Sequence, residues 1–488
     1  MKRVMIGIAA VLLILVTVLV TRTMQVAPAS DANASETAPP PGADSMIVAG
    51  HLAQAVKFQT VSYGDGVKEK ERNAAIAEFR DWMGRTYPYI FEAAPQELVG
   101  ESLLFTWQGR NPNLAPVLLM AHMDVVPVVP GTEKEWTHAP FSGDIADGYV
   151  WGRGTIDDKS SLIAILEAGE RVAMSGYQPE RTIMFAFGQD EEAGGAGGNA
   201  TIAKALQSRG TRLAWVLDEG MPILKEPYPG LNKPVALVGV GEKGYLSLEL
   251  VAHGEGGHSA RPTRDLALPR LANAITNVVN TPFVSDLDGI QRAYLDVLTP
   301  LVPFADRVVL ANMWLLKPLV IRKMEAQPEI AALLHTTISP TMLEAGVKDN
   351  VIPPTAKAVI NFRLHPRDTI ASVTEHVRQA IADPKVDIAA STETQVEASK
   401  IVSTDDPAYR YVADTMKASF AIPVAPQLMT GSTDSVHYLP IADAVLRVWP
   451  FPLSPDDLPR IHGTNERVAV DDLGPAVGFY MRLMRDLQ

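Results

Sequence analysis

The sequence predicts an α/β fold in which a mostly parallel sheet carries helices on both faces and an α+β domain is inserted into the chain. Two observations support this prediction. Between residues 46 and 243, short apolar runs alternate with segments whose apolar residues recur at helical spacing, as in strands joined by crossover helices. After residue 244 the apolar residues alternate with polar ones, as in a sheet with one exposed face.

The first part of the chain, 46–243, supplies most of the predicted parallel sheet. A late apolar run at 444–449 predicts a further strand of the same sheet, which closes the fold after the insertion. The expected elements of the first part are helices over 51–58, 73–87, 160–173 and 199–207, and strands over 116–121, 181–187 and 212–217.

The inserted α+β domain is expected over 244–364, and 365–488 should return to the first domain. Residues 245–251 alternate as a half-exposed strand does, 268–279 have the spacing of a helix, and 356–364 form another predicted strand.

Within the insertion, residues 295–324 are unusually apolar. Pro300, Pro303 and Pro318 interrupt this segment, so it does not predict a membrane span. A packed helical hairpin accounts for the composition. The wall of an acyl-binding pocket and a patch that faces a membrane are the two alternatives.

Length, charge and cysteine content narrow the function classes. A chain of 488 residues predicts two domains. Its formal net charge of −13 and the absence of a basic block argue against nucleic acid as a partner. Because the chain has no cysteine, disulfides, thiolate nucleophiles and cysteine-ligated zinc are all excluded.

The N-terminal region predicts export. Lys2 and Arg3 precede an uncharged apolar run over 4–20, and seventeen helical residues span about 26 Å. The basic residues should stay in the cytoplasm, which places the body on the extracytoplasmic (periplasmic) side. Residues 1–24 are therefore a membrane anchor or, alternatively, a signal peptide whose cleavage would release a secreted protein. Residues 25–45, rich in Ala and Pro, predict a flexible tether.

Five potential metal ligands follow strand ends or tight turns: His122, Asp157, Glu192, Asp218 and His462. Because parallel strands deliver their carboxyl ends to one edge of a sheet, these side chains should meet there. Two histidines and three carboxylates suit a pair of divalent cations bridged by one carboxylate. Asp157, on a glycine-flanked turn, has the approach that a bridging ligand needs.

Neighbouring residues complete a hydrolytic site. Alternation along a strand places His122 and Asp124 on one face, so Asp124 is expected to accept the second ring N–H of His122. Asp158 is expected to cap the helix that follows it. Of the adjacent Glu191 and Glu192, one can bind metal while the other takes a proton from water. The sequence therefore predicts a two-metal hydrolase.

Nine short motifs support a resemblance to a known family. Over about residues 46–488 the chain resembles the zinc-dependent aminoacylase and carboxypeptidase family of two-metal exopeptidases, which includes carboxypeptidase G, aminoacylase and carboxypeptidase S. It is most similar to the carboxypeptidase S branch, which includes N-fatty-acyl-amino acid synthase/hydrolases. The motifs, in family order, are HMDVVP, GRGTIDDK, DEEAGG, LDEG, GGHSA, DNVIPP, NFR, GSTDS and HGTNE.

The resemblance implies a role for each metal-site residue. Glu191 would be the general base and Asp124 the residue that orients His122. Two zinc ions are implied, although the ligand set also accepts cobalt or manganese. His122 and Asp218 would hold one ion, Glu192 and His462 the other, and Asp157 would bridge them.

The resemblance also implies groups that recognise the substrate. His258 would stabilise the oxyanion and, in dimeric members of the family, comes from the lid of the other subunit. A homodimer through the inserted domain would follow. Asn350 and Arg363 would bind substrate, Arg363 through a bidentate contact with a carboxylate. Gly431 and Ser432 would line the same pocket.

The function expected from all of this is hydrolysis of an amide bond next to an amino acid with a free carboxylate. N-acyl amino acids, including fatty-acyl ones, are the expected small-molecule substrates. A carboxypeptidase or dipeptidase for hydrophobic peptides and an amide synthase running in reverse are alternatives with the same site. A membrane-anchored binding ectodomain with an inactive site is the alternative from another class.

Overall fold

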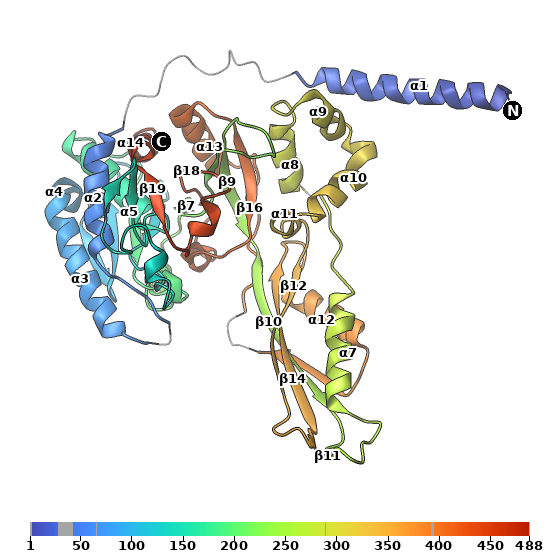
Figure 1. The fold of residues 1–488 in the computed structure, drawn as a ribbon. Coiled ribbons are helices and arrows are strands. Elements are labelled where there is room, and N and C mark those ends of the chain that lie inside the picture. Colours follow the sequence, from blue (N-terminus) through green and yellow to red (C-terminus); the bar gives the residue numbers. More distant parts are fainter. Residues whose placement is uncertain (1, 28–41, 65, 288, 392–394, 488) are drawn as a thin grey trace.

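A computed structural model describes residues 2–27, 42–64, 66–287, 289–391 and 395–487. A main domain, an elongated second domain and a projecting N-terminal helix are arranged as in Figure 1. The main sheet has ten strands, ordered β1-β2-β6-β3-β7-β17-β9-β8-β18, with β16 paired to β9. Its strands are β1 (Gln96–Val99), β2 (Ser102–Trp107), β3 (Val117–His122), β6 (Ile183–Gly188), β7 (Trp215–Asp218), β8 (Ile223–Leu224), β9 (Val235–Glu242), β16 (Val424–Met429), β17 (Val445–Arg447) and β18 (Pro452–Leu453).

The centre of this sheet is parallel, because β6, β3, β7 and β17 pair in the same direction. Every residue of β3 and β6 is buried. Alternate residues serve different cores: Leu119 and Phe185 pack on one face, whereas Leu118 and Met184 pack on the other. Burial on both faces explains why these strands are uninterrupted apolar runs. The predicted α/β class is confirmed.

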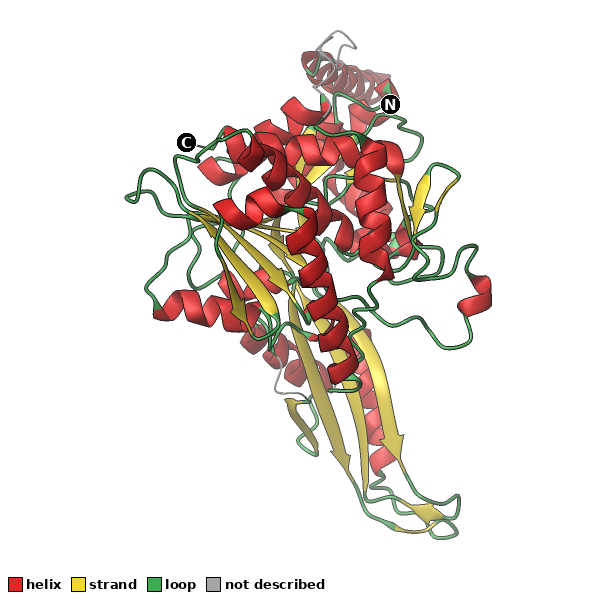
Figure 2. Ribbon diagram, turned by 90° about the vertical axis from the view of Figure 1, so that its left-hand side faces the viewer, coloured by secondary structure: helices red, strands yellow, loops and turns green. Residues whose placement is uncertain are grey.

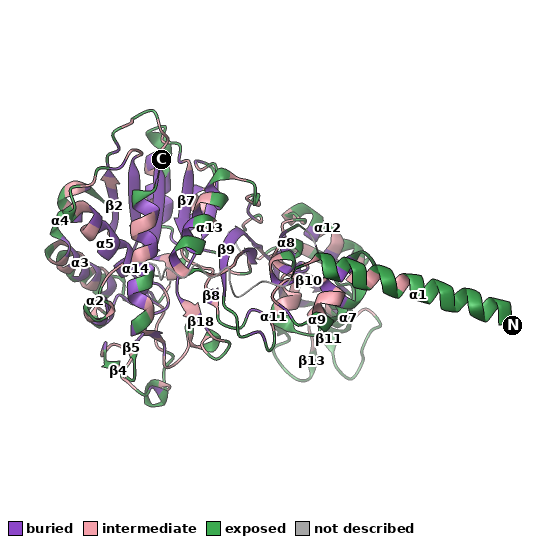
Figure 3. Cartoon of the chain, turned by 90° about the horizontal axis from the view of Figure 1, so that it is seen from above, coloured by how far each residue is buried: buried purple, intermediate pink, exposed green. Residues whose placement is uncertain are grey.

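Helices cover both faces of the sheet (Figure 3). One face carries α2 and α5 with the C-terminal helices, and the other carries α6 and the short η4 turn. These elements are α2 (Ser45–Lys57), α3 (Glu69–Thr86), α4 (Pro88–Ala93), α5 (Lys159–Met174), α6 (Asn199–Ser208), α13 (Pro407–Phe420), α14 (Val470–Arg485) and η4 (Asp434–Tyr438). A small sheet of β4 (Ile145–Ala146), β5 (Tyr149–Trp151) and β19 (Arg467–Ala469) lies beside them.

The second domain is a four-stranded sheet with helices on one face. Leu246, Leu248 and Leu250 pack against α7 and α12, while the intervening residues face away. Its elements are β10 (Gly244–His253), α7 (Ala267–Val279), β12 (Thr337–Ala345), β14 (Thr355–Leu364), α12 (Ile370–Ile381), β15 (Val386–Ala390) and the distal β11 (Gly257–His258) and β13 (Val351–Ile352). Because β15 pairs with β10, this sheet extends past residue 364, and a boundary near 391 fits it better. In Figure 2 the long strands of this sheet extend away from the main domain.

The apolar segment forms packed helices, as the sequence predicted, and they belong with the main sheet. This helical layer comprises α8 (Gly289–Leu298), α9 (Phe304–Ala311), α10 (Met313–Glu325) and α11 (Pro328–Ala331). Leu298 of α8 packs against Val235 and Leu237 of β9. The outer face of α10 remains open, with Trp314 and Leu319 each 55% exposed.

The N-terminal helix α1 (Lys2–Gln25) is the one helix in the described part of the chain that is long and apolar enough to cross a membrane. It contacts the helical layer: Asn312 Nδ2 donates to Leu19 O at 3.1 Å and Thr23 Oγ1 at 3.2 Å. Most of the expected tether, 28–41, lies outside the described residues.

A buried ion pair links the main-sheet strands β9 and β17. Arg447 and Glu242 are 0% and 2% exposed, and their Nε and Oε1 atoms are 2.8 Å apart. Arg447→Met would leave Glu242 as a buried charge without its cation, so we expect the free energy of unfolding to fall by about 3–5 kcal/mol. Urea denaturation followed by tryptophan fluorescence measures this change.

The control is Arg212→Met, which removes an ion pair with Asp443 whose side chains are 65% and 53% exposed. That change should cost less than about 1 kcal/mol. Equal losses in the two variants would show that the buried pair has no special role.

Candidate metal centre

Three neighbouring parallel strands bring acidic and imidazole groups to one edge of the main sheet. His122 is the last residue of β3, Glu191 and Glu192 follow β6, and Asp218 ends β7 with Glu219 directly after it. Because β3 lies between β6 and β7, these side chains converge. The sequence-based placement of the site is thus correct at the level of the strands.

Asp157 lies between the two histidines. Its Oδ1 is 2.9 Å from His122 Nε2, and its Oδ2 is 3.0 Å from His462 Nε2. Each carboxylate oxygen therefore faces a different imidazole, as a bridging ligand requires. Ligands about 2.0 Å from a tetrahedral zinc lie roughly 3.3 Å from one another, so these separations are close to those of a metal site.

Each histidine has a second carboxylate neighbour. His462 Nε2 is 3.3 Å from Glu192 Oε2, and His122 Nε2 is 3.2 Å from Glu219 Oε1. The groups with the spacing of metal ligands are His122 with Asp157 and Glu192, and His122 with Asp158 and Glu219. Glu219 was absent from the sequence-based ligand set.

Asp218, expected from the resemblance to be a metal ligand, has a backbone donor at each carboxylate oxygen. Its Oδ1 accepts the backbone N–H of Glu219 at 3.0 Å, and its Oδ2 accepts that of Ser435 at 2.9 Å. The carboxylate is therefore occupied by the protein, and the longer side chain of Glu219 reaches His122 in its place. The motif Asp218-Glu219-Gly220 contained both acids, and the sequence offered no criterion to choose between them.

Asp124, expected to orient His122, lies nearer to that imidazole with its backbone carbonyl than with its carboxylate. The Nδ1 atom of His122 lies 2.9 Å from the backbone carbonyl of Asp124 and 3.5 Å from its carboxylate. A carbonyl only accepts, so Nδ1 carries the proton and Nε2 is free to bind a cation. The Asp124 carboxylate accepts the backbone N–H groups of Glu191 at 3.1 Å and Glu192 at 3.3 Å. Asp124 thus holds the turn that carries both glutamates.

A buried Arg–Glu pair fixes the loop of His462 to the turn of Asp157. The Arg153 guanidinium donates to Glu466 and to the carbonyl of His462. Glu466 Oε1 in turn accepts the N–H of Asp157 at 3.2 Å. Gly154, with φ of +86°, allows this tight turn, since a Cβ there would lie 2.5 Å from Val125. Sequence analysis assigned no role to Arg153 or Glu466.

The cluster has more buried carboxylate than its protein contacts neutralise. Both oxygens of Asp158 and Oε1 of Glu192 are buried without a hydrogen-bond partner in the described part of the chain. Asp158 stands at the N-cap position of α5 but makes no capping hydrogen bond, contrary to expectation. Such unpaired charges are costly unless a cation is present, so the residues fit divalent metal ions.

The pKa values of the cluster show the same excess of negative charge. Burial, and then the charges of Asp157 and Asp158, raise the pKa of Glu219 well above its usual value. Hydrogen bonds to Asp157 and Glu192 raise the pKa of His462 to about 10. Burial also raises the pKa of the Glu191 carboxyl well above its usual value. Without a metal, this site would bind protons instead.

The loop containing Gly431 and Ser432 lies beside the cluster. It connects β16 to η4, where the N–H of Ser435 reaches Asp218 and Thr433 Oγ1 donates to Glu242 at 2.8 Å. Gly431 is half-buried and Ser432 is exposed. The structure therefore places both near the metal-site edge of the sheet.

Three expected substrate groups lie in the second domain instead. His258 and Asn350 are exposed and adjacent, since Ser259 N–H donates to the Asn350 carbonyl at 3.2 Å. They lie at the tip formed by β11 and β13, at the end remote from the main sheet (Figures 1 and 2). Arg363, on β14, stacks over the ring of Tyr245 at 4.9 Å. The structure does not bring these residues to the metal cluster.

Comparison with known proteins gives the family. The model of the peptidase family M20/M25/M40 matches residues 118–486. The chain belongs to this family. Its fold, with a large and mostly parallel central sheet, matches that of metallo-carboxypeptidases, and the chain is a metal-dependent hydrolase.

Named relatives cover nearly the whole chain. A probable carboxypeptidase S-like 2 from Dictyostelium discoideum is 36% identical and aligns with 90% of this chain and 85% of its own length. An N-fatty-acyl-amino acid synthase/hydrolase from Mus musculus is 37% identical, over 89% of this chain and 86% of its own. An M20 metallo-carboxypeptidase from Sulfolobus solfataricus shares the fold, with a TM-score of 0.62 at 18% identity over 90% of this chain and 98% of its own.

The contrast between Glu219 and Asp218 can be tested directly. Glu219→Gln removes a charged oxygen 3.2 Å from His122 Nε2, so we expect bound zinc to fall to about half of the wild-type level. Asp218→Asn keeps one oxygen, which can accept one of the two backbone N–H groups, and removes no proposed metal ligand, so its zinc content should match wild type. Elemental analysis of gel-filtered protein measures both. If Asp218→Asn lost zinc and Glu219→Gln did not, Asp218 rather than Glu219 would be the metal ligand.

Proposed function

We propose that the chain hydrolyses N-acyl amino acids at the amide bond between the acyl group and the amino acid. The Asp157 carboxylate, with one oxygen toward each histidine, is the observation on which this rests, because a bridged pair of cations suits amide hydrolysis. We infer the substrate class, N-acyl amino acids, from the names of the synthase/hydrolases that are 36–38% identical to this chain. The carboxypeptidase S-like names favour a second candidate, a peptidase that removes C-terminal residues.

In this proposal the site holds two zinc ions, with cobalt or manganese as substitutes. Bound ions would lower the pKa of a water molecule and polarise the amide carbonyl. His122 and Glu219 would hold one ion, and Glu192 and His462 the other, with Asp157 between them. Asp124 and the Arg153–Glu466 pair would keep these ligands in place.

Glu191 would move the proton. Its backbone N–H donates to the Asp124 carboxylate. Glu191 adjoins Glu192 in the sequence but is not one of the proposed metal ligands. We assign it the transfer of a proton from the attacking water to the nitrogen of the leaving amino acid. Burial favours this role, because it lets the carboxyl hold a proton between the two transfers.

The second domain would supply recognition. Arg363 has the planar guanidinium that pairs with a substrate carboxylate, while His258 and Asn350 would contact the reacting amide. Because His258 lies at the remote tip, the proposal requires closure of the second domain or a homodimer in which the tip reaches the partner's site. Met342 and Leu343 of β12, 67% and 68% exposed, offer apolar surface for such a dimer.

The N-terminal helix would anchor the enzyme on the extracytoplasmic side. Lys2 and Arg3 flank the apolar part of α1 on its N-terminal side, which favours a cytoplasmic N-terminus. Cleavage of α1 would instead release the body as a secreted enzyme. In either case the substrate would be an extracytoplasmic small molecule.

Glu191→Gln tests the proposed mechanism. The amide cannot accept a proton from water, so we expect kcat for N-acetyl-leucine to fall by roughly 10²–10⁴-fold. Zinc content should stay at the wild-type level because Glu191 is not a ligand, and Asp471→Asn, an exposed change in α14, is the control. Near-normal turnover in Glu191→Gln would exclude it as the general base.

A further inference from the structure

A cavity of about 1100 Å³ lies between the helical layer α8–α11 and one edge of the main sheet. This volume lies slightly above the usual range for small-molecule sites, which ends at about 1,000 Å³. The sheet contributes residues of β8 and β18, and the helices close the opposite side. Six of its apolar lining residues are Leu224, Leu298, Leu310, Val320, Leu333 and Leu453.

Of the five charged residues that line the cavity, Glu226, Arg322, Lys323 and Glu329 are exposed and Asp306 is half-buried. Lys323 Nζ donates to the Tyr228 hydroxyl at 3.1 Å, and that hydroxyl donates to Asp306 Oδ1 at 2.9 Å. Lys323 is 67% exposed, which places this network at the rim. The interior is therefore suited to an uncharged, apolar ligand.

One wall of the cavity belongs to the catalytic loop. Pro455, Leu458 and Pro459 line the cavity, and the chain reaches His462 three residues later. The two parts are tightly packed: a Cβ on Gly463 would lie 2.1 Å from the Pro459 carbonyl. The loop that forms the cavity wall thus also positions an imidazole of the metal centre.

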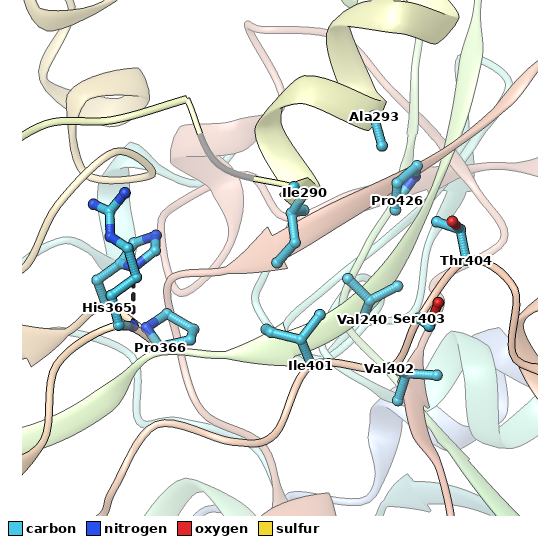
Figure 4. Close-up of a pocket in the computed structure, with 12 residues that line it drawn as sticks. Val240, Ile290, Ala293, His365, Pro366, Ile401, Val402, Ser403, Thr404 and Pro426 are labelled. Atoms are coloured by element: carbon cyan, nitrogen blue, oxygen red, sulfur yellow. Dashed lines mark hydrogen bonds between the residues drawn. The ribbon is translucent and has the colours of Figure 1, made fainter.

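A second cavity, of about 380 Å³, differs in this respect. It lies on another face of α8, where Ile290 points toward Val240 and Ile401 (Figure 4). It sits where the chain passes between the two domains, and no residue of the loop 452–463 lines it. Of these two cavities, only the larger is lined by residues of the loop that carries His462.

The larger cavity is open to solvent at the helical layer. Leu319 of α10 lines the cavity and is also 55% exposed, so the cavity reaches the surface there. The hydrogen bonds of Asn312 hold α1 against the same layer, and Figure 1 shows α1 next to α9.

We propose that this cavity binds the hydrocarbon chain of a long-chain N-acyl amino acid while the amide lies at the metal centre. The assignment rests on the proposed function and deepens it, because it names the acyl group as the part of the substrate that sets specificity. The hydrocarbon chain would extend from the metal centre toward the helical layer. The amino acid would extend toward the second domain.

A chain-length series tests this proposal on the full chain in nanodiscs. N-acetyl-, N-octanoyl- and N-lauroyl-leucine are compared below their micelle concentrations. Because each buried methylene favours binding, kcat/KM should rise about tenfold for every two carbons until the cavity is filled. An active enzyme whose kcat/KM does not rise with chain length would overturn the proposal.

Two substitutions in α10 test whether the dependence of kcat/KM on acyl-chain length arises in the cavity. Leu319→Glu places a charge in the cavity wall and should lower the lauroyl-to-acetyl ratio of kcat/KM at least tenfold. Leu315→Glu is the matched control, since Leu315 is 41% exposed on the same helix and does not line the cavity; its ratio should stay within twofold of wild type. Equal ratios in both variants would contradict the assignment.

Binding of cis-parinaric acid, a fluorescent fatty acid, separates failure of the cavity from failure of the proposed function. Wild type should bind it above an empty-nanodisc blank, and Leu319→Glu should weaken binding at least tenfold. If wild type cleaves no N-acyl amino acid but shows this binding pattern, the proposed function fails and the cavity keeps its ligand class. Absence of binding in wild type would overturn the cavity assignment.

Discussion

The mutual repulsion of buried carboxylates at one edge of the main sheet is the constraint on which the rest of the structure depends. Asp157, Asp158, Glu192 and Glu219 crowd around two imidazoles, and several of their oxygens have no protein donor in the described part of the chain. Such a cluster is stable only with cations. The parallel strands, the glycine turn before α5 and the Arg153–Glu466 pair all serve to hold it together.

The same constraint explains why recognition is placed elsewhere. The acidic edge of the main sheet repels the carboxylate of an amino acid, so a cationic group has to come from another domain. In the proposed function Arg363 of the second domain supplies this group. It lies near Lys243, whose Nζ donates to the Ala332 and His335 carbonyls. Burial, and then the nearby charge of Arg363, lower the pKa of Lys243 to about 7. Lys243 and Arg363 thus place two basic groups at the junction between the two domains.

Strand–helix alternation, the apolar runs and the short motifs were sufficient to predict the fold class and most of the metal cluster. They could not distinguish Asp218 from Glu219, because that choice depends on which carboxylate the N–H of Ser435 reaches, a contact across more than two hundred residues. The orienting carbonyl of Asp124 was missed for a related reason, since side-chain patterns carry no information about backbone acceptors. The apolar segment 295–324 signalled helices, but only the fold shows that they enclose a cavity beside the loop of His462.

The central claim is that the acidic edge is a two-cation site that drives amide hydrolysis. Zinc titration of the metal-depleted full chain, with N-acetyl-leucine cleavage as the readout, tests it most directly. The account predicts no turnover before zinc is added and a plateau at two equivalents per chain. Equal turnover with and without zinc, or a plateau at one equivalent, would contradict it.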